Sequence, residues 1–190
     1  MNHIHKFNQL ASHYDSSNNI KMAELATEAI RPFLNDERSE KVVDLGCGTG
    51  LVGLELLEDV DSMLFVDGSE KMLEQVELKL AEKSAHNASV RLMDFEKGIQ
   101  LPEKVDTIIM SLVLHHIPNY QALLASLLEQ LNEDGRLLLI EMGKQGHGHG
   151  FDMNQLAEEV QTAGFGNVEA DMFFENQESS RFLLRAMSSP

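Results

Sequence analysis

A short apolar strand that runs directly into a glycine-rich turn is the feature that most limits the fold of this 190-residue chain. Residues 41–45 predict the strand, and Gly46, Gly48 and Gly50 follow it at alternate positions. Glycine adopts backbone angles that other residues avoid, and it lets a ligand approach the main chain closely. A helix, predicted over residues 51–58, would present free N–H groups and a positive dipole end behind the turn. The sequence therefore predicts a ligand site at a strand-to-helix junction.

Strands and helices alternate along most of the chain, which predicts right-handed crossovers and a parallel sheet. Two strongly apolar runs, 105–112 and 136–142, suit strands that are covered on both faces. Further strands are predicted over 62–66 and 90–93, and helices over 8–14, 20–34, 69–84, 120–131 and 151–163. The last two strands, 167–174 and 181–186, are close enough for a hairpin. We therefore predict an α/β fold: a doubly wound, mostly parallel seven-stranded sheet with a C-terminal antiparallel hairpin and helices on both faces.

The length suits a single domain. Within it, residues 1–40 are expected to form an N-terminal helical cap segment, and residues 41–190 to form the ligand-binding domain.

Composition limits the partners of this chain. The formal net charge of -16 repels phosphate backbones and anionic membrane surfaces, so we expect neither as a partner. Acidity also has a plainer use, which is to keep a protein in solution. No apolar run approaches the roughly 18 residues of a membrane helix, and residues 1–10 lack the apolar segment of a signal peptide. Cys47 is the only cysteine, which fits a reducing compartment. We expect a cytoplasmic protein that acts on a small molecule; its oligomeric state stays open.

Three acidic residues stand at strand ends. Asp44 precedes the first glycine of the turn, Asp67 ends the second predicted strand, and Asp94 ends the third. Open parallel sheets bind ligands beyond the carboxyl ends of their strands, so these acids are candidate ligand-binding residues. The structural alternatives are that Asp67 caps the following helix and that Asp94 is simply solvated.

These motifs together resemble the class I S-adenosylmethionine-dependent methyltransferases, which have a Rossmann-like fold. The resemblance rests on Asp-Leu-Gly-Cys-Gly-Thr-Gly at 44–50, Phe-Val-Asp at 65–67, Ser-Glu-Lys-Met-Leu at 69–73, Leu-Met-Asp-Phe at 92–95 and Leu-His-His-Ile-Pro at 114–118. It implies S-adenosylmethionine as cofactor and S-adenosylhomocysteine as product. It also implies that a leading segment, residues 7–15, closes over the cofactor. The cofactor-binding residues that it implies are Tyr14, Asp44, Gly46, Cys47, Gly48, Gly50, Asp67, Gly68, Met72, Asp94, Phe95 and Ser111.

Two of these residues carry specific roles by resemblance, since Asp67 would bind the ribose hydroxyls and Asp94 the adenine amino group. The sequence departs from the family at Gly68, where an apolar side chain usually packs on adenine. That packing would fall to Met72 or Met93. A second departure is Ser-Leu-Val-Leu at 111–114 in place of an Asn-Pro-Pro-Tyr-like signature, which argues against nucleobase amines and glutamine amides as acceptors.

Two other functions remain open from the sequence. One is a non-catalytic S-adenosylmethionine-binding protein, since a fold does not guarantee chemistry. The other is a NAD-dependent oxidoreductase, because residues 48–53 match the dinucleotide fingerprint and Asp67 follows Gly48 at about the expected distance. That fingerprint normally begins directly after the strand, whereas Gly46 already ends the strand here.

Histidines supply the candidate catalytic groups. A sulfonium methyl group is already activated, so we expect direct in-line displacement, with a base needed only when the acceptor must lose a proton. His115 and His116 follow the fourth predicted strand, and either can act as that base. Alternatively, His115 caps the turn or lines the cofactor site and His116 is solvated. His147 and His149 lie in a glycine-rich loop, 143–150, and two candidate ligands are too few to predict a metal site. We expect a lid or an edge of the acceptor pocket there.

Overall fold

The structure is a computed structural model, and it describes residues 3–34, 40–144 and 150–188. The chain forms two compact units, Met1–Asp94 and Phe95–Pro190. The described residues form seven strands, in the order β3 (Ala88–Leu92), β2 (Ser62–Asp67), β1 (Lys41–Leu45), β4 (Val105–Ser111), β5 (Leu131–Met142), β7 (Ser180–Ser188) and β6 (Phe165–Glu175). Every helix among the described residues is too short or too polar to cross a lipid bilayer.

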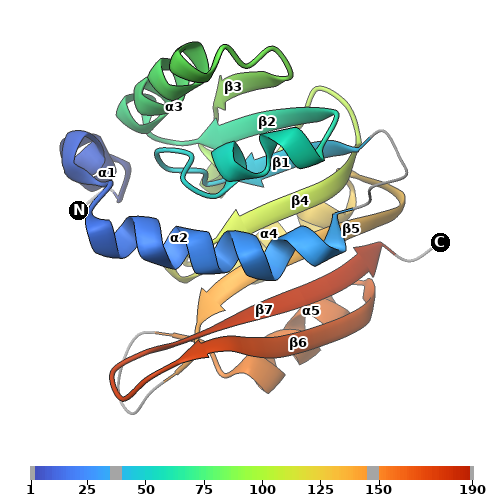
Figure 1. The fold of residues 1–190 in the computed structure, drawn as a ribbon. Helices are drawn as coiled ribbons and strands as arrows, with labels where there is room; N and C mark the ends of the chain where they lie inside the picture. The colour runs from blue at the N-terminus through green and yellow to red at the C-terminus, as the bar shows by residue number, and fades with distance from the viewer. Residues whose placement is uncertain (1–2, 35–39, 145–149, 189–190) are drawn as a thin grey trace. The chain divides into compact units, whose positions relative to one another are not determined.

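The first unit begins with helices and continues with a parallel sheet. Its elements are α1 (His3–Leu10), the 3-10 turn η1 (Ala11–His13), α2 (Ser17–Ile30), η2 (Arg31–Phe33), β1 (Lys41–Leu45), η3 (Gly53–Glu55), η4 (Leu57–Asp59), β2 (Ser62–Asp67), α3 (Glu70–Lys83) and β3 (Ala88–Leu92). β2 lies between β1 and β3 and runs parallel to both, with Asp44 opposite Phe65 and Asp67 opposite Leu92. In Figure 1, the arrow of β1 points toward the end of this unit at which α1 lies.

The sequences of β1 and β2 are apolar because their side chains form the core of the first unit. Val43, Leu45, Phe65 and Val66 have no exposed surface, and Val76 of α3 is equally buried. α3 begins as the sequence predicts, because the hydroxyl of Ser69 accepts a hydrogen bond from the Met72 N–H at 3.2 Å.

The second unit carries the remaining strands. Its elements are η5 (Phe95–Lys97), β4 (Val105–Ser111), η6 (Leu114–His116), α4 (Tyr120–Leu128), β5 (Leu131–Met142), α5 (Met153–Thr162), β6 (Phe165–Glu175) and β7 (Ser180–Ser188). β4 and β5 are parallel, whereas β7 is antiparallel to both β5 and β6. α5 packs against β6 and β7 (Figure 1). The predicted fold class is confirmed: the sheet is mostly parallel and ends in an antiparallel hairpin.

The predicted helix over residues 51–58 is wrong. Two 3-10 turns, η3 and η4, stand there instead, and no α-helix follows the glycine turn directly. In a helix the Gly53 N–H would bond to the carbonyl of Thr49, but it donates to the Asp44 carboxylate at 3.2 Å. The Thr49 carbonyl accepts instead from Lys79 Nζ at 2.7 Å. The hydrogen bond between Thr49 and Gly53 that a helix would need is therefore missing, because Asp44 and Lys79 bind its donor and acceptor groups instead.

Gly53 is the residue on which this arrangement depends most. A methyl group on its Cα would stand 2.5 Å from Cε1 of Phe65 and 2.6 Å from Oδ2 of Asp44. We therefore expect Gly53→Ala to lower the free energy of unfolding by roughly 1–3 kcal/mol, because the core must shift to accept the methyl group. Urea unfolding followed by circular dichroism measures this. Glu58→Ala, at an exposed position in η4, serves as the control and should stay within about 0.5 kcal/mol of the parent. A stabilised Gly53→Ala would contradict the tight contact.

Candidate functional site

The glycine turn is fixed to the end of the neighbouring strand. The N–H groups of Gly46 and Cys47 donate to the carbonyl of Val66 at 2.7 and 3.0 Å. Gly46, Gly48 and Gly50 have φ angles of 75°, 54° and 81°, a left-handed conformation that strongly favours glycine. The turn therefore needs its glycines for the backbone conformation itself.

Gly48 and Gly50 play different parts in this turn. A methyl group on Gly50 would stand 3.0 Å from Cδ1 of Leu54, so that position packs into the unit. Among the described residues, a methyl group on Gly48 would have only the Tyr14 ring within 4 Å, at 3.8 Å. The main chain at Gly48 is consequently open to an approaching ligand, with a tyrosine ring beside it.

Asp67 holds the turn and the start of α3 together. Its Oδ2 accepts from the Gly48 N–H at 2.9 Å, and its Oδ1 accepts from the Ser69 N–H at 2.8 Å. Asp67 thus supports the ligand-approach position and also organises the residues that precede α3.

Two carboxyl groups beside the turn lie in surroundings that disfavour their charged forms. Asp44 is 2% exposed, and burial raises its pKa to about 7, with the charge of Asp67 adding to the rise. Burial also raises the pKa of Asp67, although the backbone N–H groups that donate to its carboxylate lower it in part. Within the described part of the chain, neither acid forms an ion pair. A ligand that carries positive charge would stabilise both carboxylates.

The N-terminal segment contributes Tyr14 and is tied down at two places. Asn8 Oδ1 accepts from the Ser69 hydroxyl at 2.7 Å. Asp15 pairs with Lys79 Nζ at 2.7 Å and also accepts from the Thr49 hydroxyl. Burial raises the pKa of Tyr14, and the charges of Asp67 and Asp15 raise it further. The phenol therefore stays protonated beside the turn.

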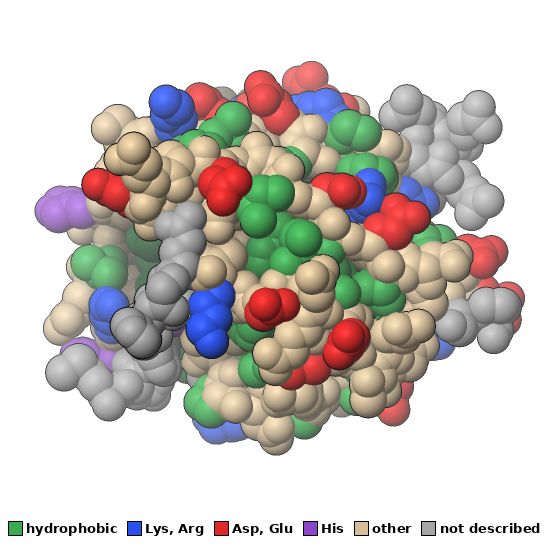
Figure 2. All heavy atoms as spheres, turned by 90° about the horizontal axis from the view of Figure 1, so that it is seen from below, with side chains coloured by type: hydrophobic (Ala, Val, Ile, Leu, Met, Phe, Trp, Pro, Cys, Tyr) green, Lys and Arg blue, Asp and Glu red, His purple; other side chains and the backbone are tan. Residues whose placement is uncertain are grey.

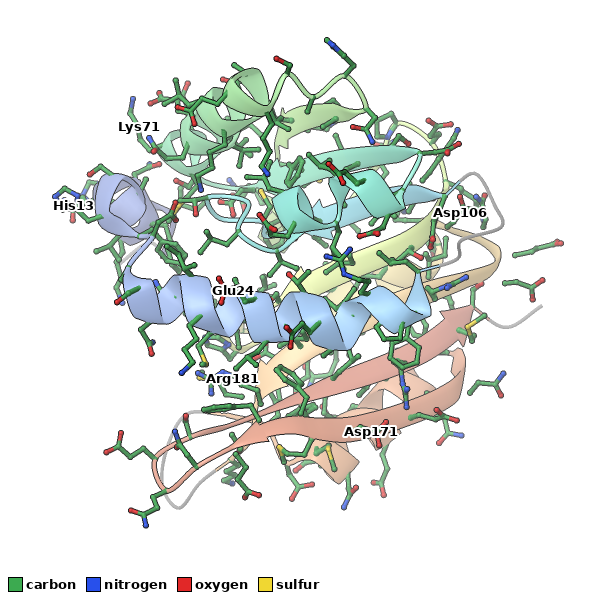
Figure 3. The ribbon with its side chains drawn as sticks, in the orientation of Figure 1. His13, Glu24, Lys71, Asp106, Asp171 and Arg181 are labelled. Atoms are coloured by element: carbon green, nitrogen blue, oxygen red, sulfur yellow. The ribbon has the colours of Figure 1, made fainter. Side chains whose placement is uncertain are left out.

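Figure 3 shows His13 and Lys71 at this junction, where η1 packs on α3. Sequence reasoning missed Asn8, Asp15 and Lys79. No local signal marks them, because their partners lie 30 to 64 residues away.

The surroundings of Gly68 differ from what the sequence suggests. Met72 is 1% exposed and belongs to the core, whereas Met93 is partly exposed. A methyl group on Gly68 would stand 3.2 Å from Cδ1 of Ile4, which belongs to α1. The side chain that lies against Gly68 therefore comes from the N-terminal helix.

Asp94 and Cys47 complete the predicted residues of the first unit. The N–H of Met93 donates to the carbonyl of Asp67 at 3.0 Å, so Asp94 follows directly after a backbone contact with the end of β2. The Cys47 thiol has its pKa raised well above the usual range by burial, and the charges of Asp44 and Asp67 add to this. A protonated thiol is a packing group, in keeping with the absence of an activating partner in the sequence.

Four predicted site residues belong to the second unit. Ser111 ends β4, and His115 and His116 lie in η6 with their ring centroids 3.9 Å apart. Phe95 lines a cavity of about 370 Å³ together with Ile117 and other residues of the α4 side. His147 and His149 fall outside the described residues. Among the described ones, no group of three or more His, Cys, Asp or Glu is placed to hold a metal ion.

Comparison with known proteins identifies the family. The family described as a methyltransferase domain matches residues 36–172, well over half of the chain. The chain therefore belongs to the methyltransferase domain family, which confirms the resemblance seen in the sequence.

Curated relatives are similar over part of their length. The malonyl-[acyl-carrier protein] O-methyltransferase of Bacillus cereus is 28% identical over 144 residues, which cover 74% of this chain and 52% of the relative. The (S)-coclaurine N-methyltransferase of Papaver somniferum is 32% identical over 145 residues, which cover 73% of this chain and 40% of the relative. The chain thus spans about half the length of these relatives.

Solved structures share the fold across most of the chain. A SAM-dependent methyltransferase from Aquifex aeolicus superposes with a TM-score of 0.77 at 19% identity, covering 95% of this chain and 97% of the other. The magnesium protoporphyrin IX methyltransferase of Synechocystis PCC 6803, crystallised with bound SAH, gives 0.73 at 22% identity, covering 90% and 86%.

The raised pKa of Asp44 makes stability depend on pH. Between the ordinary value of 3.8 and about 7, the folded protein keeps a proton that the unfolded chain has released. The free energy of unfolding therefore falls as pH rises through this window and levels off above it. Asp44→Asn has a neutral side chain of the same shape and cannot titrate. We therefore expect its free energy of unfolding, measured against that of the parent, to increase with pH up to about pH 7.

Urea unfolding at several values between about pH 5 and about pH 8 measures the difference between the two proteins. Asp61→Asn, at an exposed position, is the control and should follow the parent at each pH. A constant difference between Asp44→Asn and the parent across the range would show that Asp44 titrates normally.

Proposed function

We propose that this protein is an S-adenosylmethionine-dependent methyltransferase that transfers a methyl group to a small molecule. The observation that carries the proposal is the glycine turn of a methyltransferase-family chain. Its main chain is open at Gly48, and it is flanked by the buried Asp44 and the partly buried Asp67, neither of which has a cation partner among the described residues.

The residues of the first unit fit this cofactor on two counts. The open main chain at Gly48 leaves space for a ligand against the turn, and the Tyr14 ring covers one side of that space. Asp44 and Asp67 supply negative charge in a buried setting, which suits a ligand bearing sulfonium and ammonium groups. The proposed cofactor-binding residues are Tyr14, Asp44, Gly46, Cys47, Gly48, Gly50, Asp67, Gly68, Met72, Asp94, Phe95 and Ser111.

When bound, the cofactor would supply an electrophilic methyl group on a positively charged sulfur. The chain's own task is then to bind, orient and exclude water, because alignment of reacting groups can contribute roughly 7–11 kcal/mol of barrier lowering. Asp67 would orient the ribose through the carboxylate that already holds the Gly48 N–H. The hydrogen bond of Asn8 and the ion pair of Asp15 would keep the N-terminal segment, and Tyr14 with it, beside the turn. His115 and His116 would serve proton transfer from an acceptor that has a proton to lose.

A small-molecule acceptor is supported by charge and by the relatives. The net charge of -16 opposes nucleic acid and anionic membranes as partners. Figure 2 shows acidic side chains spread over the viewed face rather than gathered at one place. One curated relative is named for a malonyl group on acyl-carrier protein and another for coclaurine. The single cysteine, Cys47, is consistent with the cytoplasm as the place of action.

Calorimetric titration of the purified protein tests the cofactor. We expect S-adenosylmethionine and S-adenosylhomocysteine to bind and NADH to give no signal. Gly48→Val should abolish binding, because its side chain fills the space over the turn. A valine at a φ of 54° is also strained, so Gly48→Ala serves as the milder variant. Its methyl group contacts only the Tyr14 ring at 3.8 Å, so any loss of affinity reports on the ligand's space.

Gly98→Ala is the matched control for strain. Gly98, in the second unit, also has a positive φ, 120°, and no described atom lies within 4 Å of an added methyl group, so this control places alanine at a positive φ without filling a contact. It should bind S-adenosylhomocysteine as the parent does. Normal affinity in Gly48→Val would refute the site, and binding of NADH alone would favour the oxidoreductase.

A further inference from the structure

Glu141, which sequence reasoning did not single out, has a fully buried carboxylate near the end of β5. Its Oε1 accepts from the backbone N–H of Leu114 at 2.7 Å, and its Oε2 lies 2.8 Å from Nδ1 of His115. Two longer contacts, from the N–H of His115 at 3.4 Å and of Met142 at 3.3 Å, complete the set. A buried charge of this kind is costly unless donors surround it. The carboxylate therefore holds both the backbone of η6 and one ring nitrogen of its histidine.

The chain between β4 and η6 is shaped to bring His115 to this carboxylate. Leu112, directly after β4, has a φ of 59°, which is unusual for a residue other than glycine. Its N–H donates to the carbonyl of Ile140 at 2.9 Å, so this left-handed residue is still attached to β5. The chain continues into η6, where the side chain of His115 is 15% exposed.

The contact decides where a neutral His115 carries its proton. An ionised carboxylate only accepts hydrogen bonds, so Nδ1 must be the donor at 2.8 Å. A neutral imidazole has one N–H, which leaves Nε2 with a free lone pair. This nitrogen is the one suited to take a proton from another molecule.

Other charged and titratable groups lie near the Glu141–His115 pair on β7 and on η6. On β7, Arg181 stands opposite Met142, the last residue of β5, and is labelled in Figure 3. Burial lowers the pKa of Arg181, and the negative charge of Glu141 opposes that lowering. On η6 itself, the His116 ring lies 3.9 Å from that of His115. Glu141 thus interacts electrostatically with a cation on β7 and lies 2.8 Å from the imidazole on η6.

We propose that Glu141 is a positioning residue that fixes the proton of His115 on Nδ1, so that Nε2 accepts the proton of a hydroxyl acceptor. This inference rests on the proposed methyltransferase function. As the acceptor oxygen forms its bond to the methyl carbon, the methyl–sulfur bond breaks and its electron pair stays on sulfur. The hydroxyl proton passes to Nε2, leaving a methyl ether and an imidazolium paired with Glu141. Acceptor atoms that carry no proton would gain nothing from this arrangement.

Glu141→Gln tests the proposal without removing the side chain. The amide oxygen can still accept from the Leu114 N–H, but the amide NH₂ then faces Nδ1 and donates to it. The proton of the neutral ring must consequently move to Nε2. Nitrogen-15 NMR of the histidine rings at a pH where they are neutral reports the protonated nitrogen, and His115→Gln assigns the signals.

We expect wild type to carry the His115 proton on Nδ1 and Glu141→Gln to carry it on Nε2. Glu169→Gln is the matched control, because Glu169 is an exposed residue of β6 that forms an ion pair with Arg185. This variant should give the wild-type pattern. Wild type with its proton on Nε2, or Glu141→Gln with an unchanged pattern, would overturn the proposal. The wild-type spectrum decides the first point even if the variant is unstable.

Diethyl pyrocarbonate gives a second readout, because it modifies the unprotonated nitrogen of an accessible imidazole. Mass spectrometry should find His115 modified in wild type and modified several-fold more slowly in Glu141→Gln. Equal rates would contradict the proposal, since a carboxylate that only supports the backbone of η6 would not change the reactivity of Nε2.

Titration with S-adenosylhomocysteine separates this inference from the proposed function. Glu141→Gln should bind the compound as wild type does, which would show that the change at His115 is local. If wild type failed to bind it, the methyltransferase proposal would fail while the NMR result stood by itself. A loss of binding confined to Glu141→Gln would instead assign Glu141 to cofactor binding and overturn its role as a positioning residue.

Discussion

The first unit depends on how the glycine turn is attached to the end of β2. The Val66 carbonyl receives two N–H groups of the turn, and the carboxylate of the next residue, Asp67, receives a third. Parallel pairing of β1 with β2 brings these groups together, since it places Asp44 opposite Phe65. The same contacts leave the main chain at Gly48 open on its outer side. Strand pairing and ligand access are therefore two results of one set of hydrogen bonds.

Two buried carboxyl groups differ in how many hydrogen-bond donors surround them. Asp44 accepts one N–H, from Gly53, and its pKa rises to about 7. Glu141 accepts from three backbone N–H groups and a ring nitrogen, and a guanidinium lies near it. Hydrogen bonds to the charged form offset desolvation, whereas burial with few of them favours the neutral acid. A bound cation would favour the charged form of Asp44 and so lower its pKa from about 7.

Features set by neighbouring residues could be predicted from the sequence. β1 was predicted with its observed bounds, and Ser69 was predicted as the cap of α3, because an apolar run and a helix start are local patterns. The helix after the turn was wrongly predicted, since Asp44 and Lys79 take the hydrogen-bond partners that it would need. Glu141 also escaped notice, because its contact with His115 joins residues 26 positions apart. The glycines and acids of the candidate site were visible in the sequence, whereas the side chains that hold them in place were not.

The two attachments of the N-terminal segment differ in kind, which has a consequence for solution conditions. Asp15 and Lys79 form an ion pair in which each side chain is about a quarter to a third exposed, whereas Asn8 and Ser69 share an uncharged hydrogen bond. Dissolved salt screens exposed charges over about 10 Å at 0.1 M and leaves a neutral hydrogen bond nearly unaffected. Rising ionic strength therefore weakens the Asp15–Lys79 pair only in part, because both side chains are partly buried, and the hydrogen bonds of Thr49 to Asp15 and of Ser69 to Asn8 remain. Salt thus acts mainly on one of the contacts that hold the segment carrying Tyr14.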